Sequence, residues 1–248
     1  TGDGRLPPGQ RVTEKFPVMT AGAPQPAPVE SWTLELAVEA ADGAVSPLAR
    51  WDHDAVRALP MIEVRADIHC VTRWSKLDTV WRGVSFDALL AAAGDPPPED
   101  PDWPRAYVHA EADGGYAANL RLEDLRGESG AGDGAIVALE YDGRPLETDH
   151  GAPARLLVPK LYLWKSAKWL RRLTLSPFDR KGYWEKLGYH NYGDPWREQR
   201  YRGVSDADAR RTLDPELSRK IREERLGARR RGGGTGDGET GGGTPPPR

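Results

Sequence analysis

Alternating apolar and polar positions predict several short strands. Residues 31–40 (SWTLELAVEA), 61–69 (MIEVRADIH) and 105–112 (RAYVHAEA) carry apolar side chains at about every second position, which is typical of strands buried on one face. The continuous apolar run at 154–159 (ARLLVP) predicts a strand buried on both faces. The body of the protein is therefore expected to be rich in β structure.

Capping and turn signals predict the remaining elements. Residues 84–94 (VSFDALLAAAG) predict a short helix, with Ser85 as the N-cap and Gly94 just past its end. Asp142-Gly143 predicts a hairpin, and residues 166–176 (SAKWLRRLTLS) predict another strand. Together these elements indicate an α+β fold that is mostly β.

The chain divides into three parts by composition. Residues 1–30 are proline-rich and non-periodic, and we expect an extended arm that packs on the domain through its apolar centre, FPVM. Residues 31–203 form the folded domain. Residues 204–248 are expected to hold a polar helix at 214–227, which Asp214 caps, and a disordered Gly/Arg/Pro-rich tail.

Charge and cysteine content exclude several classes of protein. The net charge of −3 gives no case for nucleic-acid binding, and no apolar run is long enough for a transmembrane segment. A single cysteine excludes an internal disulfide, a zinc ribbon, a four-thiolate iron–sulfur cluster and a c-type haem. We expect a cytoplasmic protein, or a periplasmic one if a leader was removed before Thr1.

The single cysteine, Cys70, follows the strand predicted at 61–69. Three interpretations remain open from the residues alone: a small buried hydrophobe, a metal ligand or a nucleophile. A nucleophile needs a histidine within hydrogen-bond reach, and the sequence alone does not position any of the five histidines, His53, His69, His109, His150 and His190, relative to the thiol.

A second group of residues suggests an anion site. The stretch 149–160 (DHGAPARLLVPK) brings His150 before Arg155, which opens a buried strand. An arginine there needs an anionic partner. The stretch 164–170 (WKSAKWL) adds Lys165, Ser166 and Lys168. These residues predict a cradle for a phosphate or another polyanion, with surface ion pairing as the alternative.

Three motifs carry a resemblance to a known family. HCVTRWSK (69–76), DHGAPARLLVP (149–159) and SAKWLRRLTL (166–175) together resemble the molybdopterin domain of the sulfite oxidase family. The form C-V-x-x-W-S is closer to the bacterial protein-methionine-sulfoxide reductase branch, because sulfite oxidases proper usually carry C-x-G-N-R there. The likeness runs from about residue 5 to residue 203.

The resemblance implies a sulfite-oxidase-type fold around one molybdenum–molybdopterin per chain. No haem is expected, because the sequence carries no haem motif. It implies that Cys70 is the protein ligand to molybdenum, a role that suits a soft thiolate. The residues that would bind the pterin or its phosphate are His150, Arg155, Ser166 and Lys168, and the arm residues Phe16, Pro17 and Val18 match a segment that lies along the pterin. The reductase branch has asparagine and tyrosine in that segment.

The function implied is two-electron oxygen-atom transfer on a small S-oxide, N-oxide or oxoanion, in the direction of sulfoxide reduction or of sulfite-type oxidation. Tyr116, His109 and Arg73 are the further catalytic candidates, with core packing as the alternative for Tyr116 and His109. Arg73 and Lys76 would favour an anionic substrate if they faced the metal. Electrons would pass through a separate carrier, a cytochrome or a membrane haem protein. The alternative is a non-catalytic pterin- or anion-binding module that has lost the metal.

Overall fold

The computed structural model describes residues 4–21, 26–94, 107–127 and 134–203. The strands are β1 Arg11–Val12, β2 Thr33–Glu39, β3 Val45–Asp52, β4 Met61–His69, β5 Trp74–Ser85, β6 Tyr107–Ala112, β7 Ala117–Arg121, β8 Ile136–Tyr141, β9 Arg144–Pro145, β10 Arg155–Leu157 and β11 Leu170–Ser176. The α-helices are α1 His53–Ala58, α2 Phe86–Ala92, α3 Leu122–Leu125 and α4 Tyr183–Lys186, and single 3-10 turns are η1 Val29–Ser31, η3 Asp113–Gly115, η4 Thr148–His150 and η5 Leu163–Lys165. The predicted α+β, mostly β fold is confirmed.

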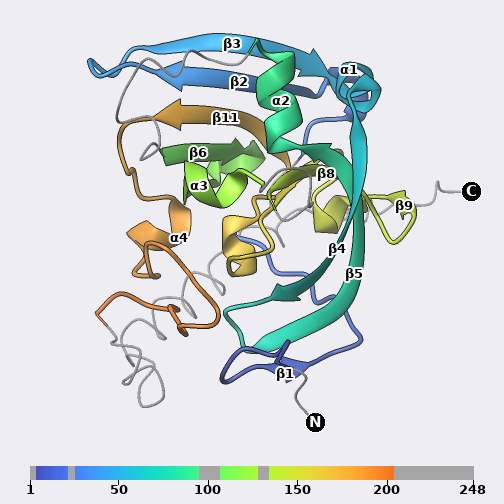
Figure 1. Ribbon diagram of the computed structural model, residues 1–248, viewed down its shortest axis with the longest axis vertical. Helices are drawn as coiled ribbons and strands as arrows, with labels where there is room; N and C mark the ends of the chain where they lie inside the picture. Colours follow the sequence, from blue (N-terminus) through green and yellow to red (C-terminus); the bar gives the residue numbers. More distant parts are fainter. Residues whose placement is uncertain (1–3, 22–25, 95–106, 128–133, 204–248) are drawn as a thin grey trace, which may run out of the picture.

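The strands form two sheets (Figure 1). One sheet has the order β1-β5-β8-β10, with β4 paired to β5 and β9 paired to β8; the other has the order β3-β2-β11-β6-β7. The pairs β1–β5 and β2–β11 are parallel, and the remaining pairs are antiparallel. Strand β5 is long and curved: its start pairs with the N-terminal arm through β1, and its end leads into α2 (Figure 1).

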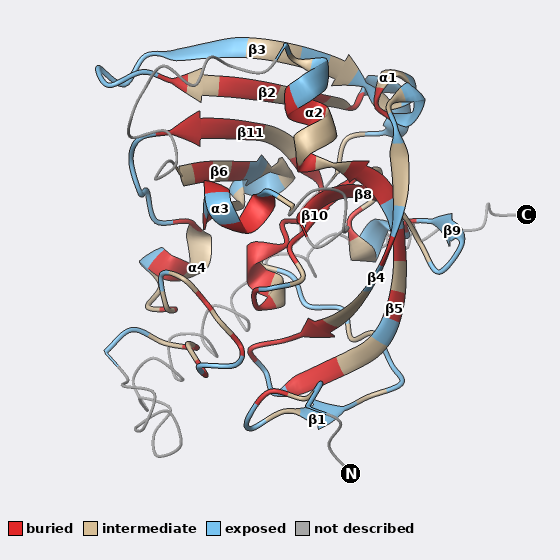
Figure 2. Cartoon of the chain, in the orientation of Figure 1, coloured by how far each residue is buried: buried red, intermediate tan, exposed pale blue. Residues whose placement is uncertain are grey.

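The central strands of the first sheet are buried on both faces (Figure 2). In β8, Val137 and Leu139 belong to one hydrophobic cluster, while Ile136 and Ala138 belong to a second cluster. The first cluster contains buried side chains from both sheets. The second includes Cys70, so the cysteine lies at the margin of a packed core.

The structure confirms the strands predicted at 31–40, 61–69, 105–112 and 154–159, and the helix capped by Ser85, whose side chain accepts a hydrogen bond from the Ala88 amide. The strand predicted at 166–176 begins only at Leu170, because the backbone at Trp169 is left-handed, with φ 56°. Strands β3 and β5 and helix α1 were not predicted. In β5, charged residues interrupt the apolar pattern although much of the strand is buried. The tail predicted from residue 204 onward lies outside the described residues.

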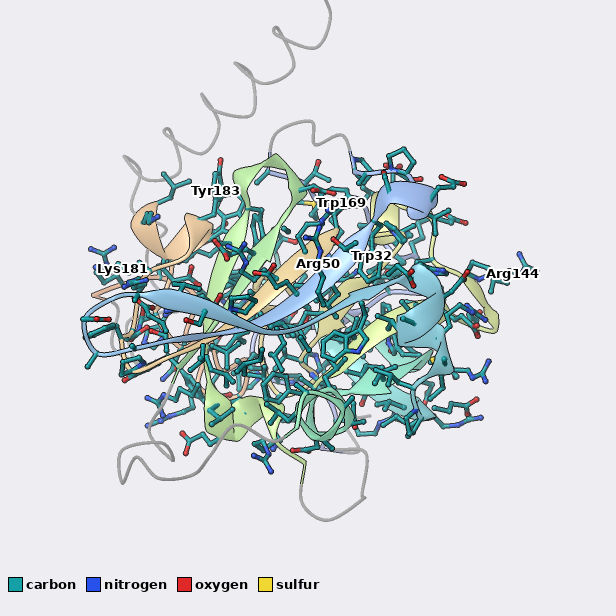
Figure 3. All side chains as sticks on the ribbon, turned by 90° about the horizontal axis from the view of Figure 1, so that it is seen from above. Trp32, Arg50, Arg144, Trp169, Lys181 and Tyr183 are labelled. Atoms are coloured by element: carbon teal, nitrogen blue, oxygen red, sulfur yellow. The ribbon has the colours of Figure 1, made fainter. Side chains whose placement is uncertain are left out.

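Charged side chains project from the rim of the molecule. Figure 3 shows Arg144 and Lys181 pointing outward at opposite ends of the view, and both residues are exposed. None of the helices within the described ranges combines the length and apolarity that crossing a bilayer requires.

The Lys165–Glu185 ion pair lies inside the fold. The Lys165 Nζ is 2.6 Å from the Glu185 Oε1, and both side chains are about 1% exposed. The Lys165 ammonium also donates to the backbone and side-chain oxygens of Asn119, each at 2.8 Å, and to the Asn191 carbonyl at 2.7 Å. Its donors are therefore all used inside the protein, and Lys165 does not belong to the predicted anion cradle.

Replacing Lys165 with methionine is expected to destabilise the protein by about 3–5 kcal/mol, because the Glu185 carboxylate then stays buried without its cation. The double variant K165M/E185L removes both charges and is expected to recover at least half of that loss. Urea unfolding measures both. The control is R65M, which breaks the exposed Arg65–Glu63 pair and should change the free energy of unfolding by less than about 1 kcal/mol. Equal losses in K165M and R65M would contradict this interpretation.

Candidate cofactor-binding site

A pocket of about 910 Å³, including its open mouth, lies beside the turn that carries Cys70. Its lining comes from the N-terminal arm, the cysteine turn, the turns around η3 and η4, the segment between β10 and β11, and α4 with the residues after it. The lining residues are Phe16, Pro17, Met19, Thr20, Ala21, Cys70, Val71, Thr72, Trp74, Asp113, Tyr116, His150, Arg155, Leu163, Trp164, Ser166, Lys168, Trp169, Trp184 and Tyr189. The fold therefore brings the cysteine motif and the predicted anion cradle into one cavity.

Cys70 is held in a tight turn directly after β4. Its amide donates to the Trp74 carbonyl at 2.9 Å, and its own carbonyl accepts from the Arg73 amide at 3.0 Å. The Cys70 Sγ lies 3.2 Å from the Thr72 Oγ1. The residue is only 6% exposed, yet it lines the pocket. The thiol is thus fixed in place and available to a ligand in the cavity.

His150, Arg155 and Lys168 come together across the Gly151 turn. Gly151 adopts φ 114°, and a Cβ there would lie 2.9 Å from the Arg155 Cβ and 3.1 Å from the Lys168 Cβ. Only glycine allows this approach. An isolated bridge also pairs Arg155 with Lys168. The predicted cradle residues are therefore neighbours in space as well as in sequence.

Arg155 is almost fully buried, with 3% exposure. Its Nη1 donates to the His150 carbonyl at 3.0 Å and its Nη2 donates to the Ser166 carbonyl at 3.1 Å. Its Nε is buried without a hydrogen-bond partner among the described residues. In the described part of the chain, no carboxylate forms a salt bridge with Arg155 or Lys168. A buried cation in this state calls for an anion from outside the protein.

The pKa values of the three cradle residues are all lowered, as expected where little negative charge lies nearby. Burial lowers the pKa of the Arg155 guanidinium to about 10. Burial, and then the positive charge of Arg155, lower the pKa of Lys168 to about 7. Burial and the two neighbouring cations also hold the pKa of His150 below its usual value. An anion bound between these groups would reverse each shift, because it stabilises the charged forms.

Aromatic side chains cover the rest of the cavity. The Phe16 ring from the arm stacks on the His150 ring, with 4.0 Å between centroids and 15° between planes. The Trp164 ring packs edge-on against Tyr189, which in turn contacts Trp184. The Trp164 Nε1 donates to the buried Glu185 at 2.7 Å, so the internal ion pair also orients this wall of the pocket.

Tyr116 lies in the pocket as predicted. Its hydroxyl donates to the Trp164 carbonyl. Burial, and then the negative charge of Glu185, raise the pKa of Tyr116 well above its usual value. The hydroxyl therefore remains protonated at neutral pH.

Two predicted catalytic residues and one predicted binding residue lie outside the lining. His109 is on the face of β6 opposite the buried Val108 and Ala110, and its Nε2 is 2.9 Å from the Phe178 carbonyl. Arg73 has a left-handed backbone, with φ 71°, and its guanidinium lies beside Gly9 instead of the cavity. Val18 is 45% exposed, whereas its neighbours Pro17 and Met19 line the pocket.

Sequence reasoning missed most of the aromatic wall. Trp164, Trp184 and Tyr189 were not selected, because aromatic residues in irregular segments carry no periodic signal. The concentration of aromatic residues at 183–192 was the available hint. Ser166 was predicted and lines the pocket, but its hydroxyl accepts from the Val158 amide at 2.9 Å.

The donor set limits how a metal would bind. The described residues contain no group of three or more His, Cys, Asp or Glu side chains that could hold an ion. A metal held at Cys70 would therefore take most of its ligands from an organic group that fills the pocket. One soft thiolate beside a cationic cradle fits a metal on an anionic sulfur-bearing scaffold.

Comparison with known proteins agrees with this arrangement. The family model of the oxidoreductase molybdopterin binding domain matches residues 21–184. The chain is 39% identical over 199 residues to the uncharacterized oxidoreductase YuiH of Bacillus subtilis, covering 80% of this chain and 92% of YuiH. It is 30% identical over 180 residues to the protein-methionine-sulfoxide reductase catalytic subunit MsrP of Gluconobacter oxydans, covering 65% and 52%. It is 31% identical over 113 residues to the sulfite oxidase of Gallus gallus, covering 45% and 24%.

These matches differ in how much of each relative they span. The chain corresponds to nearly the whole of YuiH but to about half of the reductase subunit and a quarter of the sulfite oxidase. The range of the family model contains Cys70, His150, Arg155 and Lys168. The chain therefore belongs to the family of oxidoreductases with a molybdopterin-binding domain.

Proposed function

We propose that this protein reduces neutral sulfoxides with a molybdenum–molybdopterin cofactor held in the pocket. The observation that carries the proposal is the pairing, in one cavity, of the Cys70 thiol with two cations, Arg155 and Lys168, that have no carboxylate partner among the described residues. The thiolate suits the metal, and the cations suit the phosphate of the pterin.

Different residues of the pocket would bind different parts of the cofactor. Arg155 and Lys168 would hold the phosphate, and His150, backed by the Phe16 ring, would lie against the pterin. Cys70 would bind the molybdenum. When bound, this cofactor supplies oxygen-atom transfer coupled to a two-electron change. The aromatic wall would exclude water, and Tyr116, which keeps its proton and donates a hydrogen bond to the Trp164 carbonyl, would form part of that wall.

The first two basic residues after Cys70 in the sequence point away from the pocket, which supports a neutral substrate. Arg73 is turned toward Gly9, and the Lys76 Nζ donates to the Glu14 carbonyl at 2.7 Å. Neither residue lines the pocket. Apart from the two cradle cations and His150, the cavity is lined by aromatic rings, hydroxyl groups, aliphatic side chains and the Asp113 carboxylate, none of which adds positive charge for an oxoanion. Such a surface suits a thioether or a sulfoxide. The proposed reaction is R₂SO + 2e⁻ + 2H⁺ → R₂S + H₂O.

The electrons require a partner. The relative from Gluconobacter oxydans is named a catalytic subunit, which supports a separate protein as electron carrier. The proposed electron donor is a cytochrome or a membrane haem protein.

Cys70→Ser tests the metal ligand. Loss of partners around a metal ligand commonly costs 10–100-fold in metal affinity or activity, so loss of the ligand itself should cost at least about 100-fold in sulfoxide reduction. Elemental analysis measures molybdenum per chain, and a reduced viologen dye measures turnover. His109→Gln is the matched control outside the pocket and should stay within about twofold of the wild type. Full activity in C70S would refute the assignment.

Substrate charge gives a second test. With the purified, metal-loaded protein, reduction of methionine sulfoxide by a reduced viologen is expected to exceed oxidation of sulfite by ferricyanide, because, among the described residues, neither Arg73 nor Lys76 lines the pocket next to Cys70. Both rates are measured as dye absorbance at matched enzyme concentration. Faster sulfite oxidation would instead favour a sulfite-type oxidase. A wild-type protein with pterin and no molybdenum would indicate a binding module.

The cradle itself predicts a pH dependence. Sulfate stands in for phosphate here, because it stays a dianion across neutral pH. Lys168, with a pKa of about 7, is protonated below that pH and attracts the anion; above it the charge is lost. Sulfate affinity of the cofactor-free protein, followed by tryptophan fluorescence, should therefore fall about tenfold or more between pH 6 and pH 8.5. K168M should bind weakly at both values, and a wild-type affinity that does not change with pH would contradict the role of Lys168.

A further inference from the structure

The turn that carries Cys70 is held through its carbonyl groups by both ends of the folded chain. The Gln10 Nε2 donates to the Cys70 carbonyl at 3.0 Å. The Arg200 Nη1 donates to the Val71 carbonyl at 2.6 Å. The Arg11 amide donates to the Arg73 carbonyl at 3.1 Å. Three of the four carbonyl groups of this turn are thus bound by residues at least 60 positions away in sequence.

Arg200 is a buried cation in this arrangement. It is 2% exposed, and its guanidinium lies over the Tyr162 ring at 5.0 Å from the centroid. The nearest atoms of Arg200 and Glu198 in their ion pair are 3.8 Å apart, beyond hydrogen-bond length. The strongest contact of Arg200 is therefore the one to the cysteine turn, and its positive charge stays close to the thiol-bearing loop.

The packing around this contact is tight. A Cβ on Gly9 would lie 2.6 Å from the Glu198 Oε1, 3.2 Å from the Arg73 Nη1 and 3.6 Å from the Arg200 Nη2. Arg73 and Glu198 both hold a left-handed backbone, with φ of 71° and 50°. Such conformations at non-glycine residues persist where surrounding contacts over-determine them, and they cluster at functional sites.

Gln10, Glu198 and Arg200 lie outside the range that the family model matches, residues 21–184. We propose that Arg200, with Gln10 and Glu198, forms a Cys70 clamp: it fixes the cysteine turn and places a buried positive charge beside the metal ligand. The proposal rests on the proposed function, in which Cys70 binds molybdenum. Arg200 acts through the turn, so it is a positioning residue.

The positive charge of Arg200 is expected to affect the reduction potential of the metal. A buried cation near a metal ligand favours the reduced, more negative state of the centre and so raises its reduction potential. The hydrogen bond to Val71 has a different consequence, since it limits opening of the turn. The two effects are separable, because lysine keeps the charge of Arg200 but not its two-pronged geometry.

The experiment compares R200M, R200K and Q10L with the wild type. Arg197→Met is the matched control, because Arg197 lies on the same loop and is exposed. Three quantities are measured on the full chain: molybdenum per protein, the midpoint potential of the metal by a redox titration followed by electron paramagnetic resonance, and hydrogen exchange of the peptide 68–75 in cofactor-free protein.

In R200M we expect metal affinity to fall about tenfold or more, the midpoint potential of the remaining metal to shift down, and the peptide 68–75 to exchange faster. R200K should keep a potential near that of the wild type with a lower metal content. Q10L should speed exchange without shifting the potential, and R197M should match the wild type in all three.

A midpoint potential in R200M equal to that of the wild type would overturn the electrostatic role, and unchanged exchange in R200M and Q10L would overturn the clamp. A wild-type protein that binds no molybdenum would overturn the proposed function instead. The hydrogen-exchange comparison still decides on the clamp in that case, because it uses protein without cofactor.

Discussion

The buried guanidinium of Arg155 is the constraint on which the site depends. Taking a cation out of water is costly unless an opposite charge compensates it, and among the described residues Arg155 meets only carbonyl oxygens and aromatic rings. Gly151 allows the turn after His150 to approach Arg155 and Lys168 closely, which places the three side chains of the cradle side by side. The site is therefore organised around a charge that the described residues leave without a carboxylate, and in the proposed function a bound anion would compensate it.

Three buried cations show how the degree of compensation separates structure from binding. Lys165 has a carboxylate at 2.6 Å and carbonyl oxygens for its remaining donors, so it stabilises the interior. Arg155 has no carboxylate partner in the part of the chain that the structure describes, and it faces the cavity. Arg200 lies between these cases, with a carboxylate at 3.8 Å and a short contact to the cysteine turn. Buried cations thus have three different roles in the proposed site: Lys165 stabilises the core, Arg155 faces the bound anion, and Arg200 supports the turn that carries Cys70.

Much of the fold and part of the site could be predicted from the sequence. Strand alternation gave β2, β4 and β6, and the motif around Gly151 pointed to Arg155 and Lys168. Lys165 could not be told from Lys168, because their three-residue spacing crosses a 3-10 turn that directs one inward and the other to the pocket. The positions of the other site residues depend on tertiary contacts, which the sequence pattern does not show. The alternation of β6 already placed His109 opposite the core, but only the packed structure shows what occupies that side.

The parts of the site outside the family range explain why family membership alone leaves the substrate open. The cationic cradle lies within residues 21–184, whereas Phe16, Met19 and Tyr189 belong to the flanking segments. These segments meet at the Cys70 turn, where β1 joins β5 (Figure 1). Under the proposed function, the matched core would bind what is common to the family, the pterin and its phosphate. The flanking residues would add Phe16 behind His150 and Met19 and Tyr189 to the pocket wall, so chains that share the cradle would differ in the molecule they accept.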